Sequence, residues 1–163
     1  MINFVEVILM GLWATLFMDI MAKIFGKLKV IHPTIRPEIV GRWALYMLRG
    51  KFVHEDIDKT PGLGNEKSAA LIAHYLIGII LAGIYLFIEL KMPITRYQPG
   101  MALIFGIATT LLPWFWLYPS IGLGFLASKA TNRSPYIVTS LVNHTDFGLG
   151  FLIWIAVIRR FFN

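Results

Sequence analysis

Four long apolar stretches divide this chain and set what it can fold into. From them we predict membrane spans at about residues 4–25, 66–90, 99–127 and 135–160, the third interrupted by prolines near 113–120. Each reaches the roughly 20 residues that an α-helix needs to cross the apolar interior of a bilayer. Because the bilayer offers backbone amides no water, such stretches cross it as helices. We expect an all-α fold, in which residues 1–163 form one integral membrane domain built as a bundle of four transmembrane helices.

The composition agrees with a membrane protein. Charged residues make up 15% of the chain and the mean hydropathy is +0.69, whereas about a quarter of the residues of a soluble domain are charged. The net charge of +6 is not arranged as the basic stripe with interleaved aromatic residues that is typical of nucleic-acid binding, so we expect no nucleic-acid partner. The chain has no cysteine, which excludes disulfides, thiol catalysis and thiolate-bound metal.

Basic residues indicate on which side of the membrane each connection lies. The first connection contains Lys23, Lys27, Lys29, Arg36, Arg42, Arg49, Lys51, Lys59 and Lys67, and the third contains Lys129 and Arg133. The opposite side has Lys91, Arg96, Arg159 and Arg160. The positive-inside rule then predicts that the first and third connections are cytoplasmic and that both termini lie outside the cytoplasm.

The first connection also predicts a helix of its own. Pro37 suits the first turn of a helix and Gly50 suits its end. Between them, apolar residues recur at helical spacing: Ile39, Val40, Trp43, Ala44, Met47 and Leu48. We expect a short cytoplasmic amphipathic helix between spans one and two, which either lies on the membrane surface or covers the end of the bundle.

Small and polar residues recur at helical spacing within each apolar stretch, which places each row on one face of a helix. The rows are Gly11, Thr15, Asp19 and Ala22; Ala70, His74, Gly78 and Ala82; Ala102, Gly106, Thr110 and Pro113; and Ser140, His144 and Gly148. Small residues let transmembrane helices approach closely, and Ser, Thr and His form hydrogen bonds between them. We therefore expect these rows to be the packing faces of the bundle.

Three of the rows carry an ionisable side chain, which is costly at membrane depth and usually marks a site. Counted from the cytoplasmic ends of their helices at the α-helical rise, Asp19, His74 and His144 lie about 6 to 14 Å deep. They share one half of the bilayer, so we predict that they form a pocket facing the cytoplasm. The alternative is that these side chains only hold the helices together by hydrogen bonds.

Residues of the first connection extend the predicted pocket. Arg42 and Arg49 suit a phosphate or an anionic lipid head group, and His54 and Glu55 would close the pocket from below. We predict a site that binds or moves a small ligand, an ion, a proton or a lipid head group. Histidine can bind a metal or exchange protons near neutral pH, and whether the site catalyses a reaction stays open.

Two other functions stay open. In one, the chain is a non-catalytic accessory or structural subunit, whose partners beyond the lipid bilayer are another membrane protein or further copies of itself. In the other, His74 and His144 hold haem b, since haem iron takes axial histidine, or these two residues hold a metal ion. The sequence contains no motif of a di-iron bundle, a zinc protease, a serine hydrolase or a phosphate-binding loop.

Several motifs resemble those of one family of small membrane proteins. They are Met18-Asp19, Val40-Gly41-Arg42-Trp43, the run from Arg49 to Glu55, His74-Tyr75 followed by Gly78, Pro119 with Gly122 and Gly124, and His144 followed by the run from Phe147 to Gly150. Over nearly its whole length the chain is similar to domain of unknown function family 2938, and it departs from that pattern at Ser120-Ile121. The resemblance implies a multi-pass protein of the bacterial inner membrane, with periplasmic termini by the charge rule, and it implies no reaction.

Overall fold

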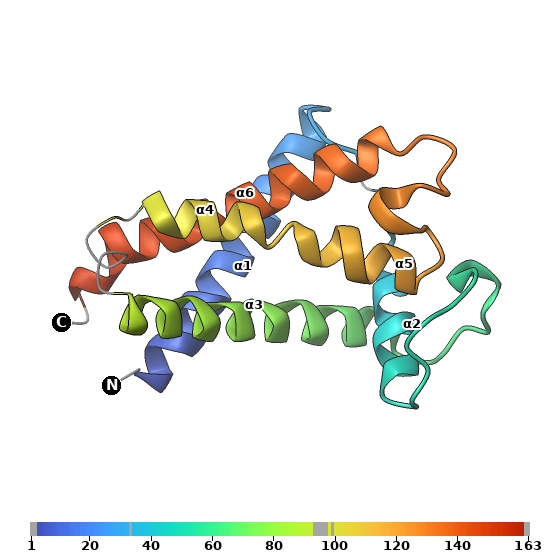
Figure 1. Cartoon of the computed structure of the whole chain (residues 1–163), viewed down its shortest axis with the longest axis horizontal. Helices are drawn as coiled ribbons and strands as arrows, with labels where there is room; N and C mark the ends of the chain where they lie inside the picture. Colours follow the sequence, from blue (N-terminus) through green and yellow to red (C-terminus); the bar gives the residue numbers. More distant parts are fainter. Residues whose placement is uncertain (1–2, 33, 93–97, 99, 162–163) are drawn as a thin grey trace.

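All of the described secondary structure is helical (Figure 1). The computed structural model describes residues 3–32, 34–92, 98 and 100–161, and Arg96, counted above for orientation, lies outside these residues. Within them, the segments that are long and apolar enough to cross a membrane are Phe4–Lys27, Glu66–Lys91, Gly100–Ser120 and Ser134–Arg160. This confirms the prediction of an all-α bundle with four transmembrane helices.

Three of the spans are nearly continuous helices and one is composite. The continuous ones are α1 (Phe4–Lys27), α3 (Glu66–Lys91) and α6 (Ser134–Ala156), and α6 is followed by the 3-10 helix η5 (Ile158–Phe161). The composite span consists of α4 (Gly100–Ala108), the π-helical segment η3 (Pro113–Leu117) and α5 (Tyr118–Ser120). The interruption expected near 113–120 is therefore a change of helix type, at a proline that removes one backbone donor.

The third span ends earlier than expected, at Ser120 rather than at residue 127. Gly122 and Gly124 follow it with φ angles of +94° and +73°. Glycine enters this left-handed region without steric cost, so the chain turns there and does not continue as a helix. A 3-10 helix, η4 (Phe125–Ala127), occupies the end of the expected span.

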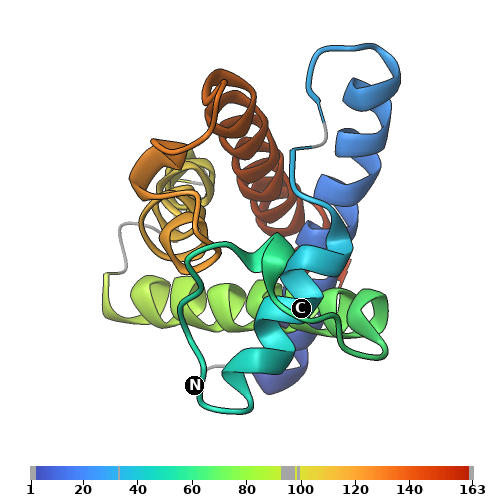
Figure 2. The same cartoon turned by 90° about the vertical axis from the view of Figure 1, so that its right-hand side faces the viewer.

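The two described ends of the chain lie at one end of the bundle, and α2 (Pro37–Met47) lies at the other (Figures 1 and 2). Helix α1 packs against both α3 and α6, and α6 packs in addition against α4. The core between them is apolar, and its most deeply buried members include Met10, Ala14, Tyr85 and Phe151.

Glycines in the predicted rows bring these helices together. A Cβ atom placed on Gly78 of α3 would lie 2.0 Å from the hydroxyl oxygen of Thr15 in α1. A Cβ atom on Gly106 of α4 would lie 2.2 Å from the Cα atom of Gly148 in α6. Because real side chains are not found this close together, each contact requires glycine. These contacts confirm that the rows are packing faces.

Helix α2 covers the end of the bundle. Ile39 and Trp43 on its apolar face are buried with Ile57 and with Ile121, which follows the third span. Its Gly41 lies against the first turn of α3, where a Cβ atom would be 1.7 Å from a backbone carbonyl oxygen. The predicted amphipathic helix is confirmed, and its buried face packs on protein.

Candidate functional site

Asp19 lies between two side chains of the neighbouring helix α3. The Nε2 atom of His74 is 3.0 Å from Asp19 Oδ1, and the hydroxyl of Tyr75 donates to Oδ2 over 3.1 Å. A carboxylate has no hydrogen to donate, so Nε2 of His74 must carry the hydrogen of this bond. In the neutral imidazole, Nδ1 then keeps a free lone pair.

The close approach of α1 and α3 makes this contact possible. Gly78 lies one turn after His74 and touches Thr15, which lies one turn before Asp19. The two backbones are therefore close enough for the short Asp19 side chain to reach across. The side chains of Asp19 and His74 remain 31% and 38% exposed, so the pair lies at the edge of the packed interface.

His144 makes a separate contact with the third span. Its Nδ1 atom is 2.7 Å from the hydroxyl oxygen of Thr109, which donates to the carbonyl oxygen of Gly106 over 2.6 Å. A hydroxyl has one hydrogen, so Nδ1 of His144 donates to Thr109 and Nε2 is left as the acceptor. Within the described residues, no hydrogen bond joins His144 to Asp19 or His74.

The contact of His144 is placed at the break in the third span. Helix α4 ends at Ala108, Thr109 lies in the turn that follows, and the π-helical segment begins at Pro113. π-helical segments inside α-helices frequently occur at functional sites. The irregular backbone of the third span thus lies next to His144, which contacts Thr109.

Arg42 ties three segments of the chain together. Its Nε atom donates to Glu66 Oε1 over 2.7 Å, and its Nη1 atom donates to the backbone carbonyls of Ile57 and Thr60 over 3.1 and 3.0 Å. The Arg42 and Glu66 side chains are only 14% and 10% exposed. The guanidinium is thus occupied by α3 and by the loop after α2, and its predicted role as an anion ligand stays a prediction.

His54 is buried inside this loop. Its Nδ1 atom is 3.1 Å from the hydroxyl oxygen of Thr60, which donates to the carbonyl of Asp56. Nδ1 is therefore the donor, and the buried Nε2 atom has no hydrogen-bond partner among the described residues. Burial, with a further contribution from the charge of Lys51, lowers the pKa of His54, so the imidazole is neutral.

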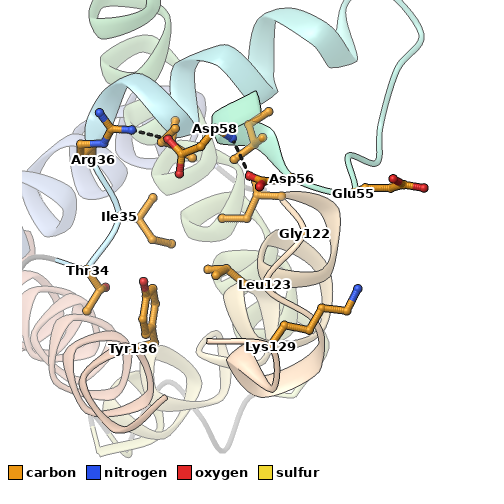
Figure 3. A pocket seen from close by; sticks show the side chains of 13 residues that line it. Thr34, Ile35, Arg36, Glu55, Asp56, Asp58, Gly122, Leu123, Lys129 and Tyr136 are labelled. Atoms are coloured by element: carbon orange, nitrogen blue, oxygen red, sulfur yellow. Dashed lines mark hydrogen bonds and ion pairs between the residues drawn. The ribbon is translucent and has the colours of Figure 1, made fainter. Parts of the chain in front are cut away.

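Arg49 and Glu55 lie at the surface of the same region. The guanidinium of Arg49 stacks over the ring of Tyr46, 5.9 Å from its centroid. Glu55 belongs to the wall of a cavity of about 270 Å³ between the start of α2, the loop at 55–58 and the turn at 121–123. Figure 3 shows its carboxylate pointing away from this cavity, whereas Asp56 and Tyr136 line it.

The predicted site residues therefore form two groups. Asp19 and His74 are in contact within the membrane-spanning part, where His144 of α6 bonds to Thr109 instead. Arg42, Arg49, His54 and Glu55 gather around α2 and the loop that follows it. Within the described part of the chain, no hydrogen bond or ion pair joins the two groups.

A third polar group, at the end opposite α2, is absent from the sequence-based prediction. Arg159 donates to Glu6 over 2.5 Å and to both oxygens of Glu89 over 2.9 and 3.0 Å, and it thereby joins α1, α3 and η5. These residues lie near the ends of three spans. Because the chain has four spans, these three ends lie on the same side of the bundle. Arg159, one of the basic residues counted for the orientation of the chain, is therefore paired with two carboxylates.

Two observations bear on the metal and haem alternatives. Among the described residues, no group of three or more His, Asp or Glu side chains is arranged to hold a metal ion. His74 directs its Nε2 atom at Asp19, so in this arrangement that nitrogen is not free for an axial bond to haem iron.

Comparison with known proteins identifies one family. The model of the family described as "Protein of unknown function (DUF2938)" matches residues 8–158, a range that contains every predicted site residue. The comparison with curated proteins finds no match. The comparison with solved structures finds no match either.

Proposed function

The chain belongs to the DUF2938 family, which has no assigned function, and we propose that it binds a small protonatable ligand inside the bilayer. The binding centre consists of Asp19, His74 and Tyr75, and His144 contributes to it from α6. The ligand enters from the side of the membrane on which α2 lies and exchanges a proton with His74.

One observation carries this proposal: the Asp19 carboxylate accepts hydrogen bonds from His74 and Tyr75 across two helices. A carboxylate that holds one ring nitrogen orients the imidazole and leaves the other nitrogen for proton transfer. The remaining nitrogen is Nδ1, and 38% of the His74 side chain is exposed. The pair thus combines a proton-exchanging group with a group that orients it, at a position that the protein does not cover completely.

The depths of these residues support a common site. Asp19 lies eight residues from the end of α1 at Lys27, and His74 lies eight residues after the start of α3 at Glu66. At the α-helical rise, both distances are about 12 Å, and His144 lies about 15 Å from the start of α6. Ionisable side chains at such depth are costly, and in transmembrane helices they usually serve a function.

Native mass spectrometry of the protein released from a mild detergent tests the proposal. We expect the wild-type protein to retain a bound small molecule. Asp19→Asn and His74→Gln should lose it, because each keeps the size of the side chain and removes its proton chemistry. Tyr75→Phe should retain part of it, since Asp19 then keeps one of its two hydrogen bonds.

Thr145→Val on α6 is the matched control, because the hydrogen bond that the Thr145 hydroxyl makes among the described residues is to the carbonyl of Leu141 in its own helix. This variant should retain the bound species at the wild-type level. The proposal is wrong if wild type and all variants carry the same species, or if wild type carries none and the site variants differ only in melting temperature.

One observation favours the alternative of an accessory or structural subunit. His144 is bonded to Thr109 at the contact of Gly106 with Gly148, and polar side chains at such contacts stabilise helix pairs. In that case His144→Gln would lower the melting temperature and leave the bound species unchanged. A coloured preparation with a Soret band would instead identify a haem protein.

A further inference from the structure

Asp146 is a buried carboxyl group that the proposed binding centre does not use. It lies on α6, is 4% exposed, and its Oδ2 atom has no hydrogen-bond partner among the described residues. One turn earlier on the same helix, the Oδ1 atom of Asn143 is also buried and without a partner. Two acceptor oxygens therefore lie in the bundle without a donor.

This side of α6 faces α1. Gly150, one turn after Asp146, accepts a hydrogen bond from the Trp13 indole and packs against Ala14. Thr139, two turns before Asp146, bonds to the backbone of His32 in the loop after α1. Asp146 lies between these two contacts along the helix.

Among the described residues of α1, α4 and α6, none supplies a charge that balances Asp146. On α1, Asp19 is engaged by His74 and Tyr75, and Glu6 is engaged by Arg159. The remaining ionisable residues of α1 are Lys23 and Lys27, and none of the described residues forms an ion pair with Asp146. Helix α4 carries no ionisable side chain, and the ionisable side chains of α6 besides Asp146 are His144 and Tyr136.

A carboxylate in these surroundings would be strongly unfavourable. Burial of an unpaired charge costs several kcal/mol, and a buried acid normally avoids this cost by keeping its proton. In a transmembrane helix no bulk water is at hand to solvate the ion. A neutral carboxyl, in contrast, has a hydrogen that can be donated toward the Asn143 oxygen.

We propose that Asp146 is an intramembrane proton-binding site, in which a neutral carboxyl on the α1-facing side of α6 holds one exchangeable proton beside Asn143. Uptake of a proton converts the carboxylate to the acid, and release returns the carboxylate. Among the described residues, no hydrogen bond or ion pair joins Asp146 to Asp19 or His74, and this proposal does not rest on the proposed function.

Infrared spectroscopy of the protein in lipid tests the proposal directly. The carbonyl stretch of a protonated carboxyl is resolved from the amide bands and shifts in deuterated water. We expect such a band in the wild-type protein at neutral pH and its loss in Asp146→Asn. Absence of the band from the folded wild-type protein, or its persistence in Asp146→Asn, would overturn the proposal.

Two control variants assign the band. Asp56→Asn removes a surface carboxylate that pairs with Lys59 and should leave the band unchanged. Asp19→Asn should also leave it unchanged, which separates this site from the proposed binding centre. If Asp19→Asn removes the band instead, the protonated acid is Asp19, and the proposal for Asp146 is wrong.

A hydrophobic carbodiimide gives a second, chemical readout. A protonated carboxyl adds to the carbodiimide and rearranges to an N-acylurea, with no group lost. We expect the adduct on the peptide that contains Asp146, at a rate that falls as the pH rises, and no adduct at this position in Asp146→Asn. An adduct on Asp19 with Asp146 unlabelled would contradict the proposal.

Discussion

Helix α2 and the loop that follows it form a cap on one end of the bundle, and single side chains hold this cap in place. Arg42 joins α2, the loop after it and the first residue of α3, because its guanidinium binds Glu66 and two backbone carbonyls. Removing it leaves the carboxylate of Glu66 largely buried and without its charged partner. The resulting loss of stability lies between the loss from breaking an ion pair on the surface and the loss from breaking a fully buried one.

We therefore predict that Arg42→Ala lowers the free energy of unfolding by about 2 kcal/mol, measured by thermal unfolding in detergent. Arg49→Ala is the matched control, since Arg49 is exposed and its described contact is a stack on Tyr46. Equal melting temperatures for wild type and Arg42→Ala would show that the ion pair does not hold the cap. Loss of an anionic lipid without loss of stability would favour the predicted anion site instead.

His54 predicts a pH dependence for the same cap. Burial of His54 in the loop after α2 lowers its pKa when that loop is docked on the bundle. As the pH falls, His54 therefore takes up a proton in the released loop before it does so in the docked loop. The stability from docking is complete above the ordinary histidine pKa of about 6.5 and decreases as the pH falls below it. The docked state is held by backbone bonds from His54 to Ser120 and from Ile57 to Ile121, at 2.8 and 3.2 Å.

Hydrogen exchange of residues 52–60 measures this docking. We expect protection to fall between neutral pH and about pH 5 in the wild-type protein, relative to the same peptide in His54→Gln. The variant corrects for the intrinsic pH dependence of exchange, because its side chain does not titrate. A constant ratio between the two proteins over this range would contradict the prediction.

At the scale of helices, the glycine contacts set the distances on which the site depends. A Cβ atom on Gly78 or Gly106 would overlap Thr15 or the backbone at Gly148, whereas Gly26 in the last turn of α1 has no atom within 4 Å of that position. Forcing extra volume into a packed contact typically costs about 1–3 kcal/mol.

We predict that Gly78→Ala and Gly106→Ala each lower the free energy of unfolding by about 1–3 kcal/mol. Gly26→Ala should be neutral or slightly stabilising. Thermal unfolding in detergent measures all three. Gly78→Ala should also weaken ligand retention, since it moves α3 away from Asp19. Three variants with the same melting temperature would show that the helices are not held at these contacts.

The rows of small residues were predictable because helical spacing is written directly in the sequence. The spacing placed Asp19 and His74 on facing surfaces of α1 and α3, where they are in contact. The partners that lie beside a row were not predictable, because Tyr75 and Thr109 depend on how far each helix is rotated and on the break after Ala108.

The cluster of Glu6, Glu89 and Arg159 joins residues that are far apart in sequence. A signal for it existed, because these charges lie near span ends that share one side of the bundle. Pairing them required the relative heights of three helices, which no local pattern contains. The role of Arg42 was missed for a similar reason, since the Arg42–Glu66 pair forms only when α2 folds back onto α3.

For the whole molecule, the open question is orientation across the membrane. Four crossings place the two described ends of the chain on the side opposite α2 (Figure 1). The excess of Lys and Arg in the first and third connections predicts that α2 is cytoplasmic.

Cysteine labelling measures the orientation, because the chain has no cysteine of its own. Lys91→Cys and Lys51→Cys place single thiols at exposed positions on opposite ends of the bundle. We predict that a membrane-impermeant maleimide labels Lys91→Cys in intact spheroplasts and labels Lys51→Cys only after permeabilisation. The reverse pattern would place α2 outside the cytoplasm.

The central claim is that the contact of α1 with α3 at Asp19 and His74 is a ligand-binding centre and does not serve only to pack the helices. A crystal structure of the wild-type protein grown from a lipidic phase tests it most directly. We predict that the carboxylate of Asp19 lies within hydrogen-bond distance of His74 and Tyr75, with density for a bound small molecule beside Nδ1 of His74. Side chains of Asp19 and His74 that point apart into the acyl chains, with lipid tails filling the space beside the imidazole, would contradict the claim.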